Sequence, residues 1–244
     1  LAKQGLKVGL IDADIYGPSI PIMFGLVDQK PEAIEIDGKV KVVPFEKYGI
    51  KVLSIGFFVD SSQALIWRGP MASNALKQLF SEAHWGDLDC MVIDLPPGTG
   101  DIHLTLVQSV KVDGIVVVST PQQVAIADAR KAVAMFNQKN IKVPILGFVE
   151  NMAWFTPAEL PDKKYHIFGK DGTSALAAEL NITMLGQIPI TESVCQSGDK
   201  GIPAVEDISN PARQAFIDCA LNVKKHLFKT ENAEKINIPP HLRN

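Results

Sequence analysis

Cysteine is scarce in this chain, and the spacing of the few that occur excludes a disulfide framework. Cys90, Cys195 and Cys219 are an odd number at wide separations among 244 residues. No Cys-x-x-Cys pair is present, and the histidines show no pair at metal-ligand spacing, so the sequence does not favour a zinc site. This pattern is typical of a reducing compartment, and we expect the protein to be cytoplasmic.

The sequence also lacks the signatures of membrane and nucleic-acid binding. No apolar run reaches the roughly 18 residues needed to cross a bilayer, so we expect no membrane association. The net charge is −3, the isoelectric point is about 6.0, and there is no basic tract, so we expect no nucleic-acid partner. With 46% hydrophobic residues, the chain is able to bury the core of a single domain.

Apolar segments alternate with amphipathic ones, which predicts an α/β protein. This alternation favours a doubly wound, mostly parallel sheet flanked by helices. A small hairpin is expected around Asp37-Gly38, and residues 229–244 are expected to form a polar C-terminal tail. The candidate strands are 7–11, 51–56, 90–94, 113–119, 144–150 and 184–188, and the candidate helices are 71–84, 125–138, 171–180 and 211–228.

Asp94 directly follows the apolar run at 90–93, at the expected carboxyl end of a buried strand. Ligands of parallel sheets collect at these ends, and a carboxylate there is suited to holding the magnesium ion of a nucleotide. The segment at 94–101, DLPPGTGD, cannot continue the strand, because its prolines remove donors and its glycines permit positive φ. It is typical of a loop whose backbone N–H groups contact a phosphate.

A second pair of carboxylates, Asp12 and Asp14, follows the apolar strand candidate at 7–11. On a period of two these side chains share a face, so one could orient a water or a metal ion while the other fixes the loop. The alternative is that each only caps a turn or a helix. Two such sites in one sheet favour phosphate chemistry.

Two later strand ends carry residues that are able to contact a base. Asn151 follows the strand candidate at 144–150 and has both a donor and an acceptor for a purine edge. Pro189 follows the candidate at 184–188 and could form a wall of the base pocket. A proline that simply ends a strand explains Pro189 equally well.

Four segments together resemble the Mrp/ApbC-type iron–sulfur carrier ATPases, which belong to the MinD-like, deviant-Walker class of P-loop NTPases. They are DADIYGPSIP at 12–21, WRGPM at 67–71, WGDLDCMVIDLPPGTGD at 85–101 and ENMAWF at 150–155. The resemblance extends to about residue 228. It implies a homodimer that sandwiches two ATP molecules, hydrolyses them slowly and carries an iron–sulfur cluster to apoproteins.

The resemblance also implies roles for single residues. Asp14 would align the attacking water and touch the magnesium shell, with Asp12 beside it. Asp94 would be the Walker B carboxylate, and Gly98 would offer an N–H group near the γ-phosphate. Asn151 would recognise adenine.

A phosphate-binding loop of the form GxxxxGK[ST] is missing from the 244 residues. Residues 1–5, LAKQG, have the pattern of a last helical turn closed by a glycine. We therefore expect 1–228 to be a P-loop ATPase domain without its first strand and phosphate loop. The lysines that neutralise phosphate belong to that loop, so the chain as given is expected not to hydrolyse ATP.

The cysteines of the family pattern are also absent. Where the family has a Cys-Pro-x-Cys pair after the Asn-Met, residues 155–160 are FTPAEL. Iron–sulfur clusters favour thiolate ligands, so a [4Fe-4S] cluster is either absent here or held by other ligands. Candidates are Glu159, His166 and Cys195, the one cysteine expected to be exposed. Two functions stay open: an ATP-dependent cluster carrier, or a nucleotide-switched dimeric adaptor that positions partner proteins without a cluster.

Overall fold

The computed structural model describes residues 1–58 and 69–229 and divides the chain into two compact units, with the boundary between Lys111 and Val112. Trp67 and Arg68 of the WRGPM segment lie outside the described residues, as does the expected tail from residue 230 onward. Among the helices that are described, none is long and apolar enough to cross a membrane.

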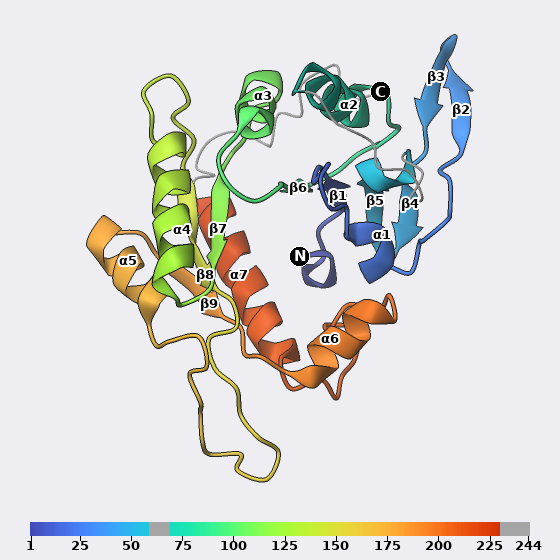
Figure 1. Ribbon diagram of the computed structural model, residues 1–244. Helices are drawn as coiled ribbons and strands as arrows, with labels where there is room; N and C mark the ends of the chain where they lie inside the picture. The colour runs from blue at the N-terminus through green and yellow to red at the C-terminus, as the bar shows by residue number, and fades with distance from the viewer. Residues whose placement is uncertain (59–68, 230–244) are drawn as a thin grey trace. The chain divides into compact units, whose positions relative to one another are not determined.

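The first unit contains a four-stranded sheet in the order β4-β5-β1-β6 (Figure 1). β1 (Val8–Asp12) pairs in parallel with β5 (Ile50–Ser54) on one side and with β6 (Cys90–Asp94) on the other. β4 (Phe45–Lys47) runs antiparallel to β5 at the edge. The three parallel strands had been expected within two residues of these bounds, because each is a short apolar run bounded by turn residues.

The register of this sheet brings three polar residues at strand ends to one level. Asp12 lies opposite Ser54 on β5 and opposite Asp94 on β6. All three residues end their strands, so the loops that follow start from the same edge of the sheet. The expectation that Asp12 and Asp94 lie at strand ends of one sheet is confirmed, and the structure further shows that the two strands are neighbours.

Among the described helices of the first unit, one precedes β1 and the others come after strand ends. The turn at residues 1–5 ends, as expected, at a left-handed Gly5 with φ 85°, but its helix is 3₁₀ rather than α. A helix also occupies 101–109, directly after the expected loop at 94–101, where no helix had been predicted. The helices are η1 (Ala2–Gln4), α1 (Ile20–Met23), η2 (Ile55–Phe57), α2 (Gly69–Ser81) and α3 (Asp101–Ser109).

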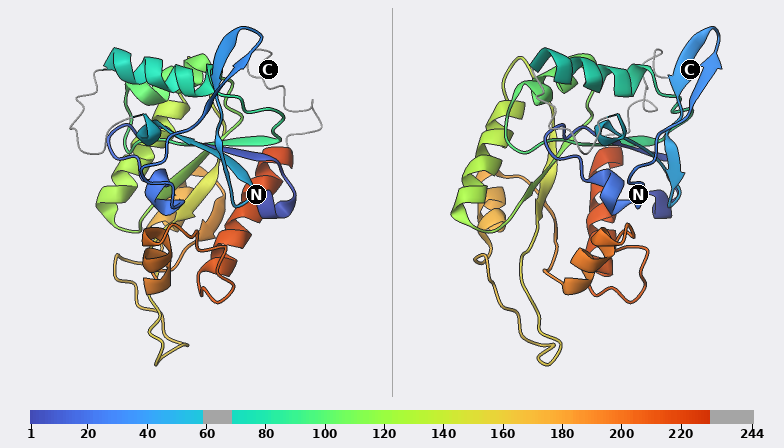
Figure 2. Two further views of the ribbon diagram at one scale, coloured as in Figure 1. Left: turned by 90° about the vertical axis from the view of Figure 1, so that its right-hand side faces the viewer. Right: turned by 45° about the vertical axis from the view of Figure 1, so that its right-hand side comes forward.

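The hairpin expected around Asp37-Gly38 is present. β2 (Ala33–Ile36) and β3 (Lys39–Val42) pair antiparallel and extend from the first unit (Figures 1 and 2). Asp37 and Gly38 have φ angles of 51° and 74°, and a two-residue turn with two positive φ angles matches the twist of the strands that it joins.

The second unit is built on a parallel sheet in the order β7-β8-β9. The strands are β7 (Ile115–Ser119), β8 (Ile145–Glu150) and β9 (Met184–Gln187), and the helices are α4 (Gln123–Phe136), α5 (Gly172–Leu180), α6 (Glu192–Asp199) and α7 (Arg213–Lys229).

Helices cover both faces of this three-stranded sheet. On one face Phe148 of β8 packs with Val133 of α4 and Leu176 of α5. On the other face Leu185 of β9 packs against Phe216 of α7 (Figure 1). The predicted architecture, a doubly wound and mostly parallel sheet flanked by helices, is confirmed.

Candidate functional site

Asp12 is fully buried, and both of its carboxylate oxygens accept hydrogen bonds. Oδ2 accepts from the Ser54 hydroxyl at 2.8 Å and from the Ile20 N–H at 3.2 Å. Oδ1 accepts from the Asp14 N–H at 3.1 Å. Desolvation raises the pKa of Asp12 although these bonds favour its charged form. The side chain therefore ties the loop at 13–20 to the sheet.

Asp14 sits in that loop and is only partly buried. Its Oδ1 accepts from the N–H groups of Tyr16 at 3.0 Å and Gly17 at 3.2 Å. Within the part of the chain that the structure describes, Oδ2 accepts no hydrogen bond. Asp14 thus combines the turn-capping role with one oxygen that can contact a ligand.

Asp94 lies at the end of β6 with its side chain exposed, and its carbonyl accepts from the Ala13 N–H at 2.8 Å. The carboxyl is nevertheless partly desolvated. This desolvation, followed by repulsion from Asp12 and then from Asp14, raises the pKa of Asp94 to about 6. A divalent cation would relieve that repulsion.

The aspartates do not by themselves form a metal cage. No group of three or more His, Cys, Asp or Glu side chains positioned to hold a metal ion occurs in residues 1–58 and 69–229. Magnesium is commonly bound through one or two carboxylates together with substrate phosphates and water. The oxygen-only chemistry of Asp14 and Asp94 fits that mode.

Gly98 lies in the loop that follows Asp94 and has a φ of 89°. A Cβ atom at this position would meet nothing within 4 Å, so the backbone conformation rather than crowding favours glycine here. The loop from Pro97 to Gly100 is exposed. The Gly100 N–H donates to His103 Nδ1 at 3.2 Å, whereas the N–H groups of Gly98 and Thr99 donate to no group of the described residues.

The two expected base-contacting residues, Asn151 and Pro189, belong to the second unit, whereas the aspartates belong to the first. The Asn151 N–H donates to the Ser119 carbonyl at 2.8 Å, and its Oδ1 accepts from the Met152 N–H at 2.9 Å. Its Nδ2 group donates to no acceptor in the described residues, so its N–H donors are available to a ligand. Pro189 follows Ile188 directly after β9 and is half-buried.

Glu150 is the functional-site residue that the sequence analysis missed. It is 1% exposed, at the end of β8, between Ser119 and Gln187 in the sheet register. Oε2 accepts from the Thr173 N–H at 2.9 Å, and Oε1 accepts from Gln187 Nε2 at 2.8 Å. An acidic residue ending an apolar strand was its only sequence signal. Glu150 closes the base of the excursion at 151–171.

That excursion extends away from the strands of its unit in both figures (Figures 1 and 2). Phe155 forms a bridge with Tyr165, and the Lys164 ammonium lies 3.7 Å from the centre of the Trp154 ring. Phe155 immediately precedes the segment TPAEL at 156–160. The loop is therefore held by an aromatic–cation contact and backbone pairing.

None of the three cysteines forms a disulfide within the described residues, and they lie in different settings. Cys195 is exposed on α6, as expected, with its Sγ 3.9 Å from the Asp199 carboxylate. Cys90 is buried in β6. Cys219 packs on the β9 side of α7, and burial raises the pKa of its thiol.

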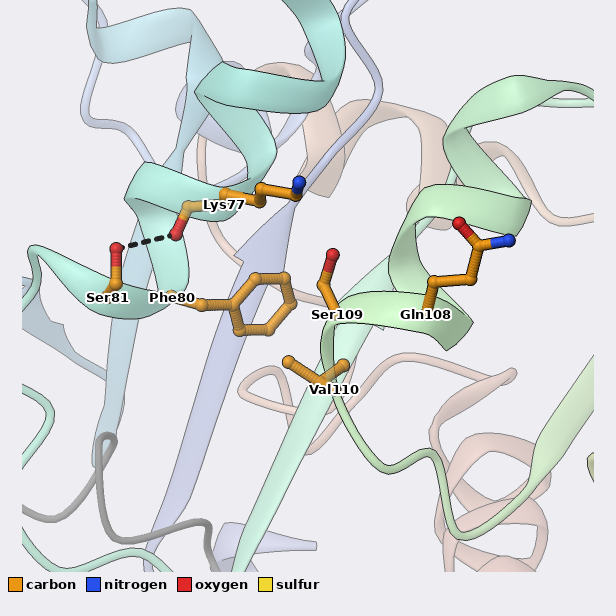
Figure 3. Close-up of a pocket in the computed structure, with 6 residues that line it drawn as sticks. All are labelled: Lys77, Phe80, Ser81, Gln108, Ser109 and Val110. Atoms are coloured by element: carbon orange, nitrogen blue, oxygen red, sulfur yellow. Dashed lines mark hydrogen bonds between the residues drawn. The ribbon is translucent and has the colours of Figure 1, made fainter.

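A hollow of about 350 Å³ lies at the C-terminal ends of α2 and α3 (Figure 3). The loop after Asp94 enters α3 at its opposite end, so this hollow is separate from the aspartates. It is lined by Lys77, Phe80, Ser81, Gln108, Ser109 and Val110.

Comparison with known families shows which family the chain belongs to. The family model described as "ParA: NUBPL iron-transfer P-loop NTPase" matches residues 1–224. The chain belongs to this family. The resemblance inferred from the four sequence segments is thereby confirmed.

Relatives of the chain occur in bacteria and plants. An iron-sulfur cluster carrier protein of Aquifex aeolicus is 48% identical over 90% of this chain and 59% of its own length. An iron-sulfur protein required for NADH dehydrogenase, mitochondrial, from Arabidopsis thaliana is 42% identical over 97% of this chain and 76% of its own. The chain therefore spans little more than half of the Aquifex relative.

Solved structures agree with this assignment. A nucleotide-binding protein of Archaeoglobus fulgidus, in complex with ADP, is 37% identical with a TM-score of 0.71 over 88% of this chain and 81% of that one. The cell division ATPase MinD of Pyrococcus furiosus shares the fold, with a TM-score of 0.62 over 92% and 88% of the two chains at 19% identity.

Replacing Glu150 with alanine should destabilise the second unit. Glu150→Ala leaves the Thr173 N–H and the Gln187 amide without their acceptor in a buried site, at an expected cost of about 2–4 kcal/mol. Urea unfolding monitored by tryptophan fluorescence measures this cost. Glu179→Ala, which removes an exposed partner of Arg130, is the matched control and should change stability little. Equal effects of the two substitutions would contradict the structural role of Glu150.

Replacing Asp94 with asparagine should alter how stability depends on pH. The raised native pKa means that the folded chain holds a proton that the unfolded chain has lost between about pH 4 and pH 6. Stability contributed by Asp94 therefore falls as the pH rises through this window. Without magnesium, Asp94→Asn should raise the melting temperature at pH 8 and have little effect at pH 4. The exposed Asp87→Asn is the control, and a pH-independent difference would contradict the prediction.

Proposed function

We propose that the whole protein binds and hydrolyses ATP with magnesium and uses this cycle to transfer iron–sulfur clusters to apoproteins. The observation that carries the proposal is the pairing of β1 and β6, which sets Asp12, Asp14 and Asp94 at one sheet edge in a member of an iron-transfer NTPase family. A homodimer is the proposed active form. Cysteines that form no disulfide within the described residues suit a reducing compartment such as the cytoplasm.

The geometry suggests how the residues of the first unit divide this work. Asp14, with an unused oxygen, would align the attacking water, and the buried Asp12 would hold the loop of Asp14 in place. Asp94 would hold magnesium, which neutralises charge on the phosphates. The Gly98 N–H would contact the γ-phosphate. Phosphoryl transfer depends mainly on such positioning and charge stabilisation.

In the second unit, Asn151 and Pro189 are the proposed contacts of the adenine base. Asn151 offers its Nδ2 donors, and Pro189 offers an apolar surface. We further propose that residues 1–228 are one nucleotide-binding domain and that the phosphate-neutralising lysines lie outside these 244 residues. The chain as given would then not hydrolyse ATP.

A second function is favoured by the excursion at 151–171, which contains no cysteine and keeps its shape through Trp154–Lys164 and Phe155–Tyr165 contacts. In this alternative the protein is a nucleotide-switched dimeric adaptor that positions partner proteins without binding a cluster. Cys195 is the exposed thiol that would have to replace the missing pair if a cluster is held.

Removing the Asp14 carboxylate should separate ATP binding from hydrolysis. In the whole protein, Asp14→Ala should lower the hydrolysis rate at least about 100-fold, the usual contribution of a positioned acid–base group, while ATP stays bound. Phosphate release and equilibrium ATP binding are the two measurements. Asp87→Ala is the control, and turnover at the wild-type rate in Asp14→Ala would remove Asp14 from this role.

The cluster hypothesis is tested by measuring iron and acid-labile sulfide after anaerobic reconstitution of the whole protein. Stoichiometric cluster per dimer supports the carrier function, and its loss in Cys195→Ser would identify the substitute ligand. Cys90→Ser, at a buried position, is the matched control. No cluster under conditions that load a Cys-Pro-x-Cys relative would favour the adaptor.

A further inference from the structure

His103 is a buried histidine directly beneath the exposed loop that follows Asp94. Only 6% of the residue is exposed, and it is the third residue of α3. The ring atom Nδ1 accepts from the Gly100 N–H at 3.2 Å, and the backbone N–H of His103 donates to the Gly100 carbonyl at 3.1 Å. This reciprocal pair closes the N-terminus of α3 in the manner of a capping box.

A second contact of the ring is with the opposite end of the same loop. The ring is hydrogen-bonded to the backbone of Pro96. Proline has no N–H, so the Pro96 group must be its carbonyl and the ring must donate. Because Nδ1 is the acceptor for Gly100, we assign the donor to Nε2–H. The two ring nitrogens therefore bind both ends of a five-residue segment, 96–100.

Little else holds the apex of this segment. Pro97, Gly98 and Thr99 are exposed, and apart from its chain neighbours no atom of the described residues lies within 4 Å of the Cβ position of Gly98. Pro96 itself is buried, and the strand before it is fixed by the Ala13–Asp94 bond. The conformation of the apex thus depends on its two ends.

The histidine is itself firmly placed. Two other residues of α3, Ile102 and Leu106, are buried in the first unit. The Thr105 hydroxyl is hydrogen-bonded to the Ser73 hydroxyl of α2 at 2.9 Å. Desolvation lowers the pKa of His103, which keeps the ring neutral and leaves Nδ1 able to accept from Gly100. A neutral ring with its proton on Nε2 satisfies both contacts at once.

We propose that His103 is a positioning residue for nucleotide hydrolysis, whose two ring nitrogens clip the ends of loop 96–100 and orient the Gly98 N–H toward the terminal phosphate. The inference rests on the proposed ATPase function. Its physical basis is preorganisation, because a donor aimed in advance at developing charge stabilises the transition state without rearranging.

Two substitutions test the clip in the whole protein. His103→Leu keeps an apolar side chain beneath the loop but removes both hydrogen bonds. His103→Gln retains an acceptor for the Gly100 N–H and a donor for the Pro96 carbonyl. A misplaced loop donor should lower kcat about 100-fold in the leucine variant with KM changed less than about threefold, and glutamine should restore most of kcat. Equal losses in both variants, or none in leucine, would overturn the proposal.

Amide hydrogen exchange and nitrogen NMR separate this inference from the ATPase proposal. Exchange at the Gly100 N–H should be at least tenfold faster in His103→Leu than in the wild type and in His103→Gln, whether or not ATP is hydrolysed. In the wild type, the nitrogen chemical shifts of His103 should show a neutral ring protonated on Nε2. A ring protonated on Nδ1 would overturn the clip even if the leucine variant does not fold. If the clip is present but no variant turns over ATP, the ATPase proposal fails instead.

Discussion

The arrangement of the first unit depends on the buried carboxylate of Asp12. Placing a charge away from water is costly unless hydrogen bonds compensate, and Asp12 receives bonds from Ser54, Ile20 and Asp14. These partners come from the neighbouring strand and from the loop that Asp12 itself begins. The same interaction therefore fixes the strand register, the path of the loop and the position of Asp14.

The second unit repeats this arrangement with Glu150. In both units a buried carboxylate at a strand end fixes the local backbone, and a more accessible neighbour is left to face a ligand. Asp14 has this relation to Asp12, and Asn151 has it to Glu150. The division accounts for the unequal burial of polar residues close together in the sequence: the buried one maintains the backbone geometry, and the other remains more accessible.

Much of the fold could be predicted from the sequence, because short apolar runs bounded by glycine, proline and aspartate specify strands locally. The Asp37-Gly38 hairpin followed from turn chemistry alone. Helix α3 was missed because a glycine precedes it as N-cap and a histidine rather than glutamate completes its cap. Glu150 was missed because its partners Thr173 and Gln187 are distant in sequence, and only the folded sheet brings them together.

The clamp at Glu150 has a consequence for how this chain tolerates change. Because residues 150 and 173 are joined by a hydrogen bond, the intervening excursion begins and ends at one fixed point. Lengthening such a loop is inexpensive, at about 0.6 kcal/mol for each doubling. The sequence of the excursion can therefore change without disturbing the sheet that supports it. It can gain or lose metal ligands, or accept an insertion.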